Sequence, residues 1–312
     1  MELYHGLGEV EVDAVGTVVT LGNFDGVHRG HETVLTTVAA LARQEGLRSI
    51  AMTFDPHPRT VHRPDEPTVM INSTRQRADL IAATGIDGLL IQPYDLDFAA
   101  QSAEEFVRRY FVEALRAKIV VVGDDVRFGK DNEGTIETLR RLGEKFGFRV
   151  ETIDEVGRGG RYSSSRIREQ LTAGDVAEAA DQLGRYHALH GTVVHGDARG
   201  RDLGFPTANL SDDPDGLVPA DGVYAGWATF SGEDQAYPAA ISVGTNPTFQ
   251  GQVRRVEAYV LDKEFGEFDV YDREMTLEFV SRIRGQVAFT GMDDLIVQMH
   301  EDIADVREVL HT

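Results

Sequence analysis

The chain has 312 residues, of which 41% are apolar and 27% charged, a composition typical of a globular protein with one large or two ordinary domains. It contains no cysteine, which excludes a disulfide framework, thiol catalysis and cysteine–zinc sites, and no apolar stretch is long enough to span a membrane. A formal net charge of −21 argues against nucleic acids and anionic membranes as partners, because both are negatively charged. No signal-peptide pattern opens the sequence, and we therefore expect a cytoplasmic protein.

The first half of the chain alternates between strand and helix patterns. Strands are expected at 18–21, 49–54, 88–91, 119–123 and 148–153, and helices at 31–45, 73–84, 102–117 and 134–146. This alternation predicts a Rossmann-like α/β domain, in which a parallel sheet carries helices on both faces. Ligands bind to such sheets beyond the carboxyl ends of the strands, where the turn-forming segments 22–31, 55–58 and 123–129 should meet.

The pattern changes in the second half. We expect a helix over 163–187 with a break near Gly174, followed by strands at 191–195, 222–230, 239–243, 255–261 and 275–280. Short strands separated by turn residues are typical of an antiparallel β-barrel, and a helix over 292–310 closes the chain. We place the domain boundary near residue 186, which gives domains 1–186 and 187–312.

The most informative motif is the segment 22–31, Gly-Asn-Phe-Asp-Gly-Val-His-Arg-Gly-His, between the first strand and the first helix. A strand, a glycine-rich turn and a helix N-terminus together form a site that attracts phosphate. His28 and His31 share a face of the first helical turn, where they can bind phosphate oxygens or stabilise charge that develops on them. Two solvated helix caps are the alternative, and zinc is less favoured because no third ligand is close. The His-x-Gly-His pattern resembles the signature of nucleotidyltransferases, which transfer an adenylyl group from ATP.

Three further segments, 53–58, 123–129 and 163–168, carry polar residues beside glycine, proline or serine. Each can also be explained structurally, as a turn or a helix cap. Taken with the segment 22–31, they resemble the adenylyltransferase half of bacterial bifunctional riboflavin kinase/FAD synthetases. The resemblance implies that ATP and its phosphates are bound by Gly22, Asn23, Phe24, Asp25, Ser164, Ser165 and Arg168, and FMN by His57, Pro58 and Asp125.

The second half continues the resemblance. Glycines in the segment 195–204 let backbone N–H groups approach phosphate, and Pro-Thr-Ala-Asn follows at 206–209. The Thr207 hydroxyl and the Asn209 side-chain carbonyl are hard oxygen ligands that suit Mg²⁺. Taken alone, Thr207 and Asn209 can also be explained as part of a turn, and Glu257 as a solvated residue of a strand. The kinase half of the same family has these strings in the same order. It implies ATP binding by Gly196, Gly200, Gly204, Pro206, Thr207 and Asn209, Mg²⁺ binding by Thr207 and Asn209, and Glu257 as the catalytic base.

The resemblance implies two consecutive reactions. The C-terminal domain would phosphorylate riboflavin with Mg-ATP to give FMN, with Glu257 orienting or deprotonating the ribityl hydroxyl. The N-terminal domain would transfer AMP from a second ATP to FMN, giving FAD and pyrophosphate. His28 and His31 would stabilise the transition state, and Ser164, Ser165 and Arg168 would hold the leaving pyrophosphate. The expected partners are small molecules, namely riboflavin, FMN and ATP, with a weak homo-oligomer left open.

Two segments depart from the family pattern. Val126 stands where the family often has Phe, and the segment 284–289 lacks the usual Glu-Lys before Phe289, in a region that shapes the flavin end of the kinase site. Three alternatives therefore remain. The first is an enzyme with one active half, the kinase being the half at risk. The second is a flavin- or nucleotide-sensing regulator without turnover. The third is an adenylyltransferase whose barrel binds nucleic acid, which the negative charge disfavours.

Overall fold

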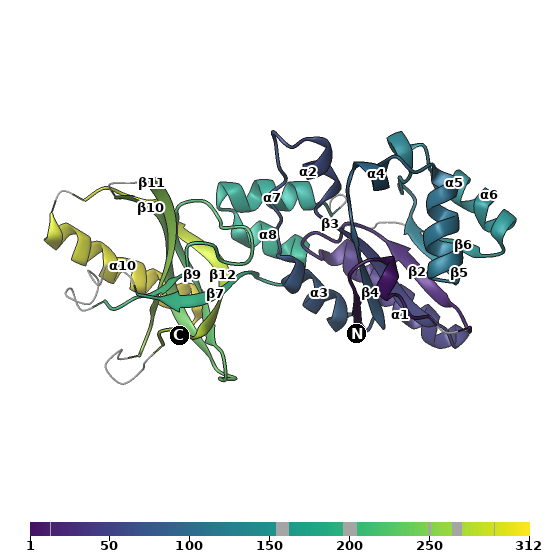
Figure 1. Cartoon of the computed structure of the whole chain (residues 1–312). Coiled ribbons are helices and arrows are strands. Elements are labelled where there is room, and N and C mark those ends of the chain that lie inside the picture. Colours follow the sequence, from purple (N-terminus) through teal and green to yellow (C-terminus); the bar gives the residue numbers. More distant parts are fainter. Residues whose placement is uncertain (13, 154–161, 196–204, 249–250, 264–269, 290) are drawn as a thin grey trace. The chain divides into compact units, whose positions relative to one another are not determined.

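A computed structural model describes the chain except for residues 13, 154–161, 196–204, 249–250, 264–269 and 290 (Figure 1). It divides into two compact units, Met1–Tyr162 and Ser163–Thr312, and each is described by itself. The helices that follow Tyr162 belong to the second unit in this division. The domain boundary near residue 186 stays a prediction.

The first unit is built on a six-stranded parallel sheet in the order β1-β4-β3-β2-β5-β6. The strands are β1 (Glu2–Tyr4), β2 (Thr17–Leu21), β3 (Arg48–Asp55), β4 (Gly88–Pro93), β5 (Ala117–Gly123) and β6 (Arg149–Ile153). The helices are α1 (Arg29–Glu45), α2 (Pro58–His62), α3 (Thr74–Ala83), α4 (Leu96–Ala99), α5 (Ala103–Phe106) and α6 (Ile136–Phe146), with short η1 (Leu7–Glu9) and η3 (Lys130–Asn132) and a π-helical η2 (Val107–Ala114). The parallel α/β prediction is confirmed.

Strand β2 lies between β3 and β5, so the direction of strand succession reverses there. In open α/β sheets, ligands bind beyond the carboxyl ends of the strands at such a reversal. Side chains of the central strands alternate between the two faces. Val18 and Val121 join a core with Val34 and Leu35 of α1, whereas Val19 joins a second core under η2 and α6. This double burial explains why the strands read as continuous apolar runs.

The prediction of one helix over 102–117 is wrong in its extent. The structure has α5, then the π-helical η2 that ends at Ala114, and β5 already begins at Ala117. The aromatic residues on this segment pack into the core, with Phe106 and Tyr110 stacked 5.1 Å apart between ring centroids. Tertiary packing of these rings overrides the regular helical period that the sequence suggests.

The second unit is a closed barrel in the order β10-β11-β8-β7-β12-β9, and every strand pair is antiparallel. Its strands are β7 (His187–Val194), β8 (Ala208–Leu210), β9 (Gly222–Phe230), β10 (Ala236–Thr248), β11 (Gly251–Val260) and β12 (Glu274–Arg284). Its helices are α7 (Ser164–Ala173), α8 (Val176–Leu183) and α10 (Met292–Leu310). The barrel, the terminal helix and the break at Gly174, which has φ +89°, are confirmed.

Helix α10 packs on the outside of the barrel through one apolar face. Its Val306 and Leu310 are buried against Ala225 and Leu261 of the barrel. None of the helices in the described residues is both long enough and apolar enough to cross a membrane. The short strand β8 was not expected, because Thr207–Leu210 can be read as a turn; it is held by pairing with β7 on one side and β11 on the other.

Candidate active sites

The turn after β2 has an unusual backbone. Phe24, Gly26 and Val27 have φ angles of +49°, +81° and +38°, and the left-handed region is costly for the two residues that are not glycine. Left-handed residues in a turn direct successive N–H groups towards one side, which is the geometry of anion-binding loops. Gly22 has no room for a side chain, because a Cβ there would lie 2.9 Å from the Phe24 ring. The turn is therefore shaped for close approach of a ligand to the backbone.

His28 and His31 lie together at the start of α1. His28 is the N-cap residue, and its Nδ1 accepts a hydrogen bond of 3.3 Å from the His31 backbone N–H. The two imidazoles stack, with centroids 3.6 Å apart and planes 13° apart, and the Phe24 ring meets His31 edge-on at 5.4 Å. This arrangement aligns two polar rings with the positive end of the helix dipole, where an anion is favoured.

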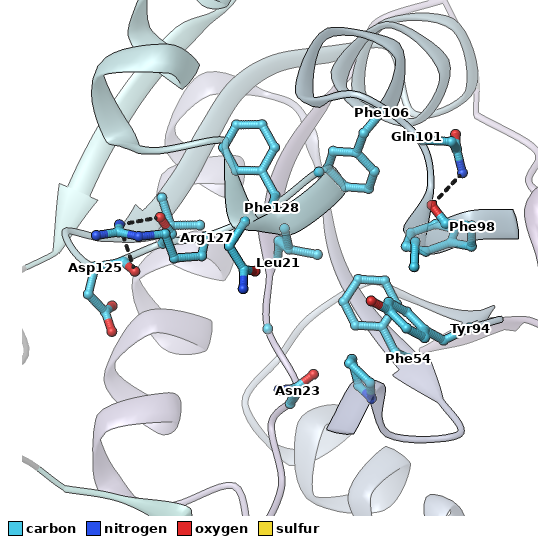
Figure 2. A pocket seen from close by; sticks show the side chains of 16 residues that line it. Leu21, Asn23, Phe54, Tyr94, Phe98, Gln101, Phe106, Asp125, Arg127 and Phe128 are labelled. Carbon is cyan, nitrogen blue, oxygen red and sulfur yellow. Dashed lines mark hydrogen bonds between the residues drawn. The ribbon is translucent and has the colours of Figure 1, made fainter. Parts of the chain in front are cut away.

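A cavity of about 390 Å³ lies at the carboxyl edge of the sheet (Figure 2). The segments 22–31, 55–58 and 123–129, which were expected to meet at this edge, all contribute lining residues, including Asn23, Pro58 and Asp125. Five aromatic side chains also line it: Phe54, Tyr94, Phe98, Phe106 and Phe128. Figure 2 shows the rings of Phe54, Tyr94 and Phe98 gathered on one side, with Asp125 and Arg127 on the other. A wall of this kind suits a flat aromatic ligand.

The aromatic wall was missed in the sequence. Its members come from β3, from the turn after β4, from α4, from α5 and from the segment after β5, so no local motif unites them. The rule that ligands bind at the carboxyl ends of parallel strands could have found Phe54 and Tyr94, which stand at the ends of β3 and β4. Val126 also lines the cavity, and Phe128 nearby supplies an aromatic surface that Val126 does not.

Two other expected residues of this site make hydrogen bonds within the fold. Asp25 is 1% exposed, and its Oδ1 accepts a hydrogen bond of 2.9 Å from the Ile71 N–H. His57 does not line the cavity; it caps α2, with Nδ1 accepting from the Arg59 N–H at 3.1 Å. Both residues therefore shape the segments that carry Asn23 and Pro58, and their binding of ATP and FMN stays a prediction.

Ser164, Ser165 and Arg168 lie in the first turns of α7, in the second unit. The Arg168 guanidinium donates to the Ser165 hydroxyl at 3.5 Å, and among the described residues the N-cap Ser163 makes no side-chain capping bond. A helix N-terminus with hydroxyls and an arginine is suited to an anion. Their role towards pyrophosphate stays a prediction.

In the second unit, the pairing of β8 with β11 sets Asn209 opposite Glu257. The Thr207 hydroxyl donates to Glu257 Oε2 at 3.3 Å, and Asn209 Nδ2 lies 3.4 Å from both the backbone oxygen and the Oγ1 of Thr207. Asn209 is 8% exposed, and within the described part of the chain its buried Oδ1 has no hydrogen-bond partner. Pro206 directly precedes this group, whereas Gly196, Gly200 and Gly204 lie outside the described residues.

Glu257 also lines a cavity of about 500 Å³. The other lining residues are Asp221, Ser242, Gly244, Thr245, Arg255, Gln286, Val287 and Ala288. Ser242 of β10 is the cross-strand neighbour of Glu257. The carboxylate therefore has an oxygen-rich cluster on one side and a ligand-sized space on the other.

Comparison with known proteins agrees with this two-site arrangement. Residues 11–167 match the family model for FAD synthetase, and residues 183–310 match the family model for riboflavin kinase. The bifunctional riboflavin kinase/FMN adenylyltransferase of Escherichia coli K12 is 34% identical over 310 residues, which cover 99% of this chain and 97% of that relative. The relative of the same name from Bacillus subtilis 168 is 35% identical over 298 residues, with 94% and 92% covered.

The chain belongs to the bifunctional riboflavin kinase/FMN adenylyltransferase family. Its first half carries the FAD synthetase domain and its second half the riboflavin kinase domain, in the expected order. A solved structure from Streptococcus pneumoniae, titled a macrolide-efflux protein, superposes on the whole chain with a TM-score of 0.87, at 32% identity and with 98% of both chains covered. Both units thus have a close structural counterpart.

Residues 284–289 are expected to depart from the family pattern, and the structure shows what holds this segment. The Gln286 amide donates to the Val243 carbonyl at 2.9 Å and to the Ser242 hydroxyl at 3.3 Å, which attaches the segment to β10. Arg284 makes a two-pronged ion pair of 2.7 and 2.6 Å with Asp302 of α10, which is 5% exposed. The cavity wall beside Glu257 is therefore fixed from both sides.

Proposed function

We propose that the C-terminal unit phosphorylates riboflavin with Mg-ATP, that the N-terminal unit adenylylates the resulting FMN, and that the residues described above carry these steps. The main support is the meeting of Thr207, Asn209 and Glu257 beside a cavity, because hard oxygen ligands and a carboxylate are the groups that phosphoryl transfer to a hydroxyl needs. The stacked pair of His28 and His31 supports the second reaction.

In the kinase unit, Glu257 accepts the proton of the terminal ribityl hydroxyl as its oxygen attacks the γ-phosphorus of ATP, and ADP leaves. The hydrogen bond from Thr207 holds the carboxylate in place. The flavin end of the substrate binds in the cavity that is lined by Gln286 and Ser242. Most of the rate comes from positioning, because phosphoryl transfer asks little covalent chemistry of the protein.

Thr207 and Asn209 fit a magnesium ion. The buried Asn209 Oδ1 has no hydrogen-bond partner among the described residues, and a buried carbonyl of this kind is costly unless a donor or a cation meets it. When it is bound, Mg²⁺ would neutralise negative charge on the phosphate oxygens of ATP. The family resemblance implies that Gly196, Gly200 and Gly204 bind ATP; they lie outside the described residues.

In the adenylyltransferase unit, a phosphate oxygen of FMN is the nucleophile and attacks the α-phosphorus of ATP, so no protein nucleophile is needed. The turn N–H groups and α1 hold the phosphates, and His28 and His31 donate hydrogen bonds to oxygens whose charge grows in the transition state. The aromatic cavity takes the flavin ring. The family resemblance implies that Ser164, Ser165 and Arg168 hold the leaving pyrophosphate.

The test uses the two halves as controls for each other. The full chain is incubated with riboflavin, ATP and Mg²⁺, and riboflavin, FMN and FAD are resolved by chromatography over time. Glu257→Gln should lower FMN formation by about 10²- to 10⁴-fold and still convert added FMN to FAD. His31→Gln should accumulate FMN and form little FAD.

Three results would contradict the proposal. Wild-type protein that makes FAD only from added FMN would be an enzyme with one active half, and protein that converts neither substrate would be a regulator. Variants with unchanged rates would remove Glu257 or His31 from the chemistry. Cytoplasmic location and a weak homo-oligomer stay predictions.

A further inference from the structure

Arg77 of α3 is a buried charged residue to which the mechanism above gives no role. The residue is 2% exposed and lies under the carboxyl edge of the sheet rather than in solvent. Burying a guanidinium is costly unless its donors find acceptors and its charge is compensated. The question is therefore which groups satisfy Arg77.

The Arg77 guanidinium donates to two backbone carbonyls from different walls of the aromatic cavity. Nη1 donates to the Asn23 oxygen at 3.1 Å, and Nη2 donates to the Phe54 oxygen at 3.2 Å. Asn23 belongs to the turn after β2, and Phe54 to the end of β3, and both residues line the cavity. The Thr53 hydroxyl also donates to the Asn23 oxygen, at 3.0 Å. A planar fork can hold two such carbonyls at a fixed spacing.

Two carboxylates compensate the charge. Burial lowers the pKa of Arg77 below its ordinary value, and the negative charges of Asp25 and Asp55 act in the opposite direction. Both carboxylates also order backbone or side chains nearby, since Asp25 accepts from the Ile71 N–H and Asp55 accepts from the Thr74 hydroxyl at 2.9 Å. Asp25 lies in the phosphate turn and Asp55 ends β3, so the Coulombic attraction of Arg77 acts on the same two walls as its hydrogen bonds.

We propose that Arg77 is a positioning residue for adenylyl transfer, which fixes the nucleotide turn after β2 relative to the flavin-side end of β3. Arg77 acts through Asn23 and Phe54 and touches neither substrate. Movement of either wall would break a hydrogen bond to the same group, so one side chain sets the distance between the two binding sites. The inference rests on the proposed function, because it takes ATP to bind at the turn and FMN in the aromatic cavity.

The test compares three variants of the full chain. Arg77→Lys keeps the charge but replaces the planar fork with a single ammonium, and Arg77→Met removes both. Thr53→Val is the matched control, because it removes another donor to the Asn23 carbonyl and leaves charge and the Phe54 carbonyl unchanged. The measurements are kcat and KM for ATP and FMN, the dissociation constants of both ligands by equilibrium dialysis, and thermal unfolding.

Arg77→Lys should raise the KM and the dissociation constants of both ATP and FMN by about tenfold. Thr53→Val should raise the dissociation constant of ATP alone, by about threefold. Loss of thermal stability in Arg77→Lys with all binding constants within twofold of wild type would show a merely structural role and overturn the inference. If Arg77→Met does not fold, Arg77→Lys decides. Wild-type protein that forms no FAD from FMN would sink the proposed function, and the dissociation constants would still decide the role of Arg77.

Discussion

His187 makes the barrel sensitive to acid. The residue begins β7, is 1% exposed, and its Nε2 lies 2.7 Å from the Leu217 carbonyl oxygen. Because a carbonyl only accepts, Nε2 carries the proton of the neutral ring. Burial lowers the pKa of His187 from 6.5 to about 4, and the nearby charge of Arg185 acts in the same direction, whereas the hydrogen bond to Leu217 opposes it. His187 therefore becomes protonated at a lower pH in the folded unit than in the unfolded chain.

The sign and size of the effect follow from the two pKa values. Between pH 6.5 and pH 4 the unfolded chain binds more protons at His187 than the folded chain, so the stabilisation is full above pH 6.5 and is lost as the pH falls towards 4. One pKa unit corresponds to about 1.4 kcal/mol, and the loss in free energy of unfolding at pH 5 is therefore about 2 kcal/mol relative to pH 7.

The assay is urea unfolding at pH 7, 6 and 5, followed by the fluorescence of Trp227, the single tryptophan, which lies on β9 and reports on the barrel. His187→Gln keeps an N–H donor for the Leu217 carbonyl and does not titrate in this range. The variant should lose about 2 kcal/mol less than wild type between pH 7 and pH 5.

The control is His311→Gln, since His311 is exposed at the end of α10. This variant should keep the wild-type pH dependence. The reasoning is refuted if wild type and His187→Gln lose stability in parallel, because His187 would then not be the group whose protonation opposes folding.

Three further changes test the geometry of the sites. Gly22→Ala would force a Cβ to 2.9 Å from the Phe24 ring, and adenylyl transfer should fall about tenfold or more while riboflavin phosphorylation is unchanged. Asp302→Asn leaves Arg284 without its carboxylate, which should cost about 3 kcal/mol of barrel stability and raise the KM for riboflavin. Asn209→Leu removes the oxygen that we assign to Mg²⁺, and the Mg²⁺ concentration for half-maximal kinase activity should rise about tenfold.

For each of these changes, a control or a second measurement distinguishes the proposed cause from general loss of stability or from an unrelated effect. Asp305→Asn removes an exposed carboxylate of the same helix and should leave both stability and the riboflavin KM unchanged. A magnesium requirement that is the same in Asn209→Leu as in wild type would remove this residue from the metal site. Equal losses of both activities in Gly22→Ala would point to general unfolding rather than to the turn.

The sequence by itself determined the two-domain plan and the elements that carry the motifs. Strand and helix periods are local properties, so alternation predicted the parallel sheet, and short strands between turn residues predicted the barrel. The glycine-rich turn and the two histidines were visible for the same reason, because strand, turn and helix are contiguous at 17–45.

Only the tertiary structure decided which distant residues meet. Asn209 and Glu257 lie far apart in sequence and face each other because β8 pairs with β11. Arg77 has the pattern of a solvent-facing arginine on a polar helix, yet it is buried because the turn after β2 and the end of β3 offer it carbonyls. The aromatic cavity, the π-helical turn of η2 and the anchoring of Gln286 on β10 likewise depend on contacts between separate elements, which no local period encodes.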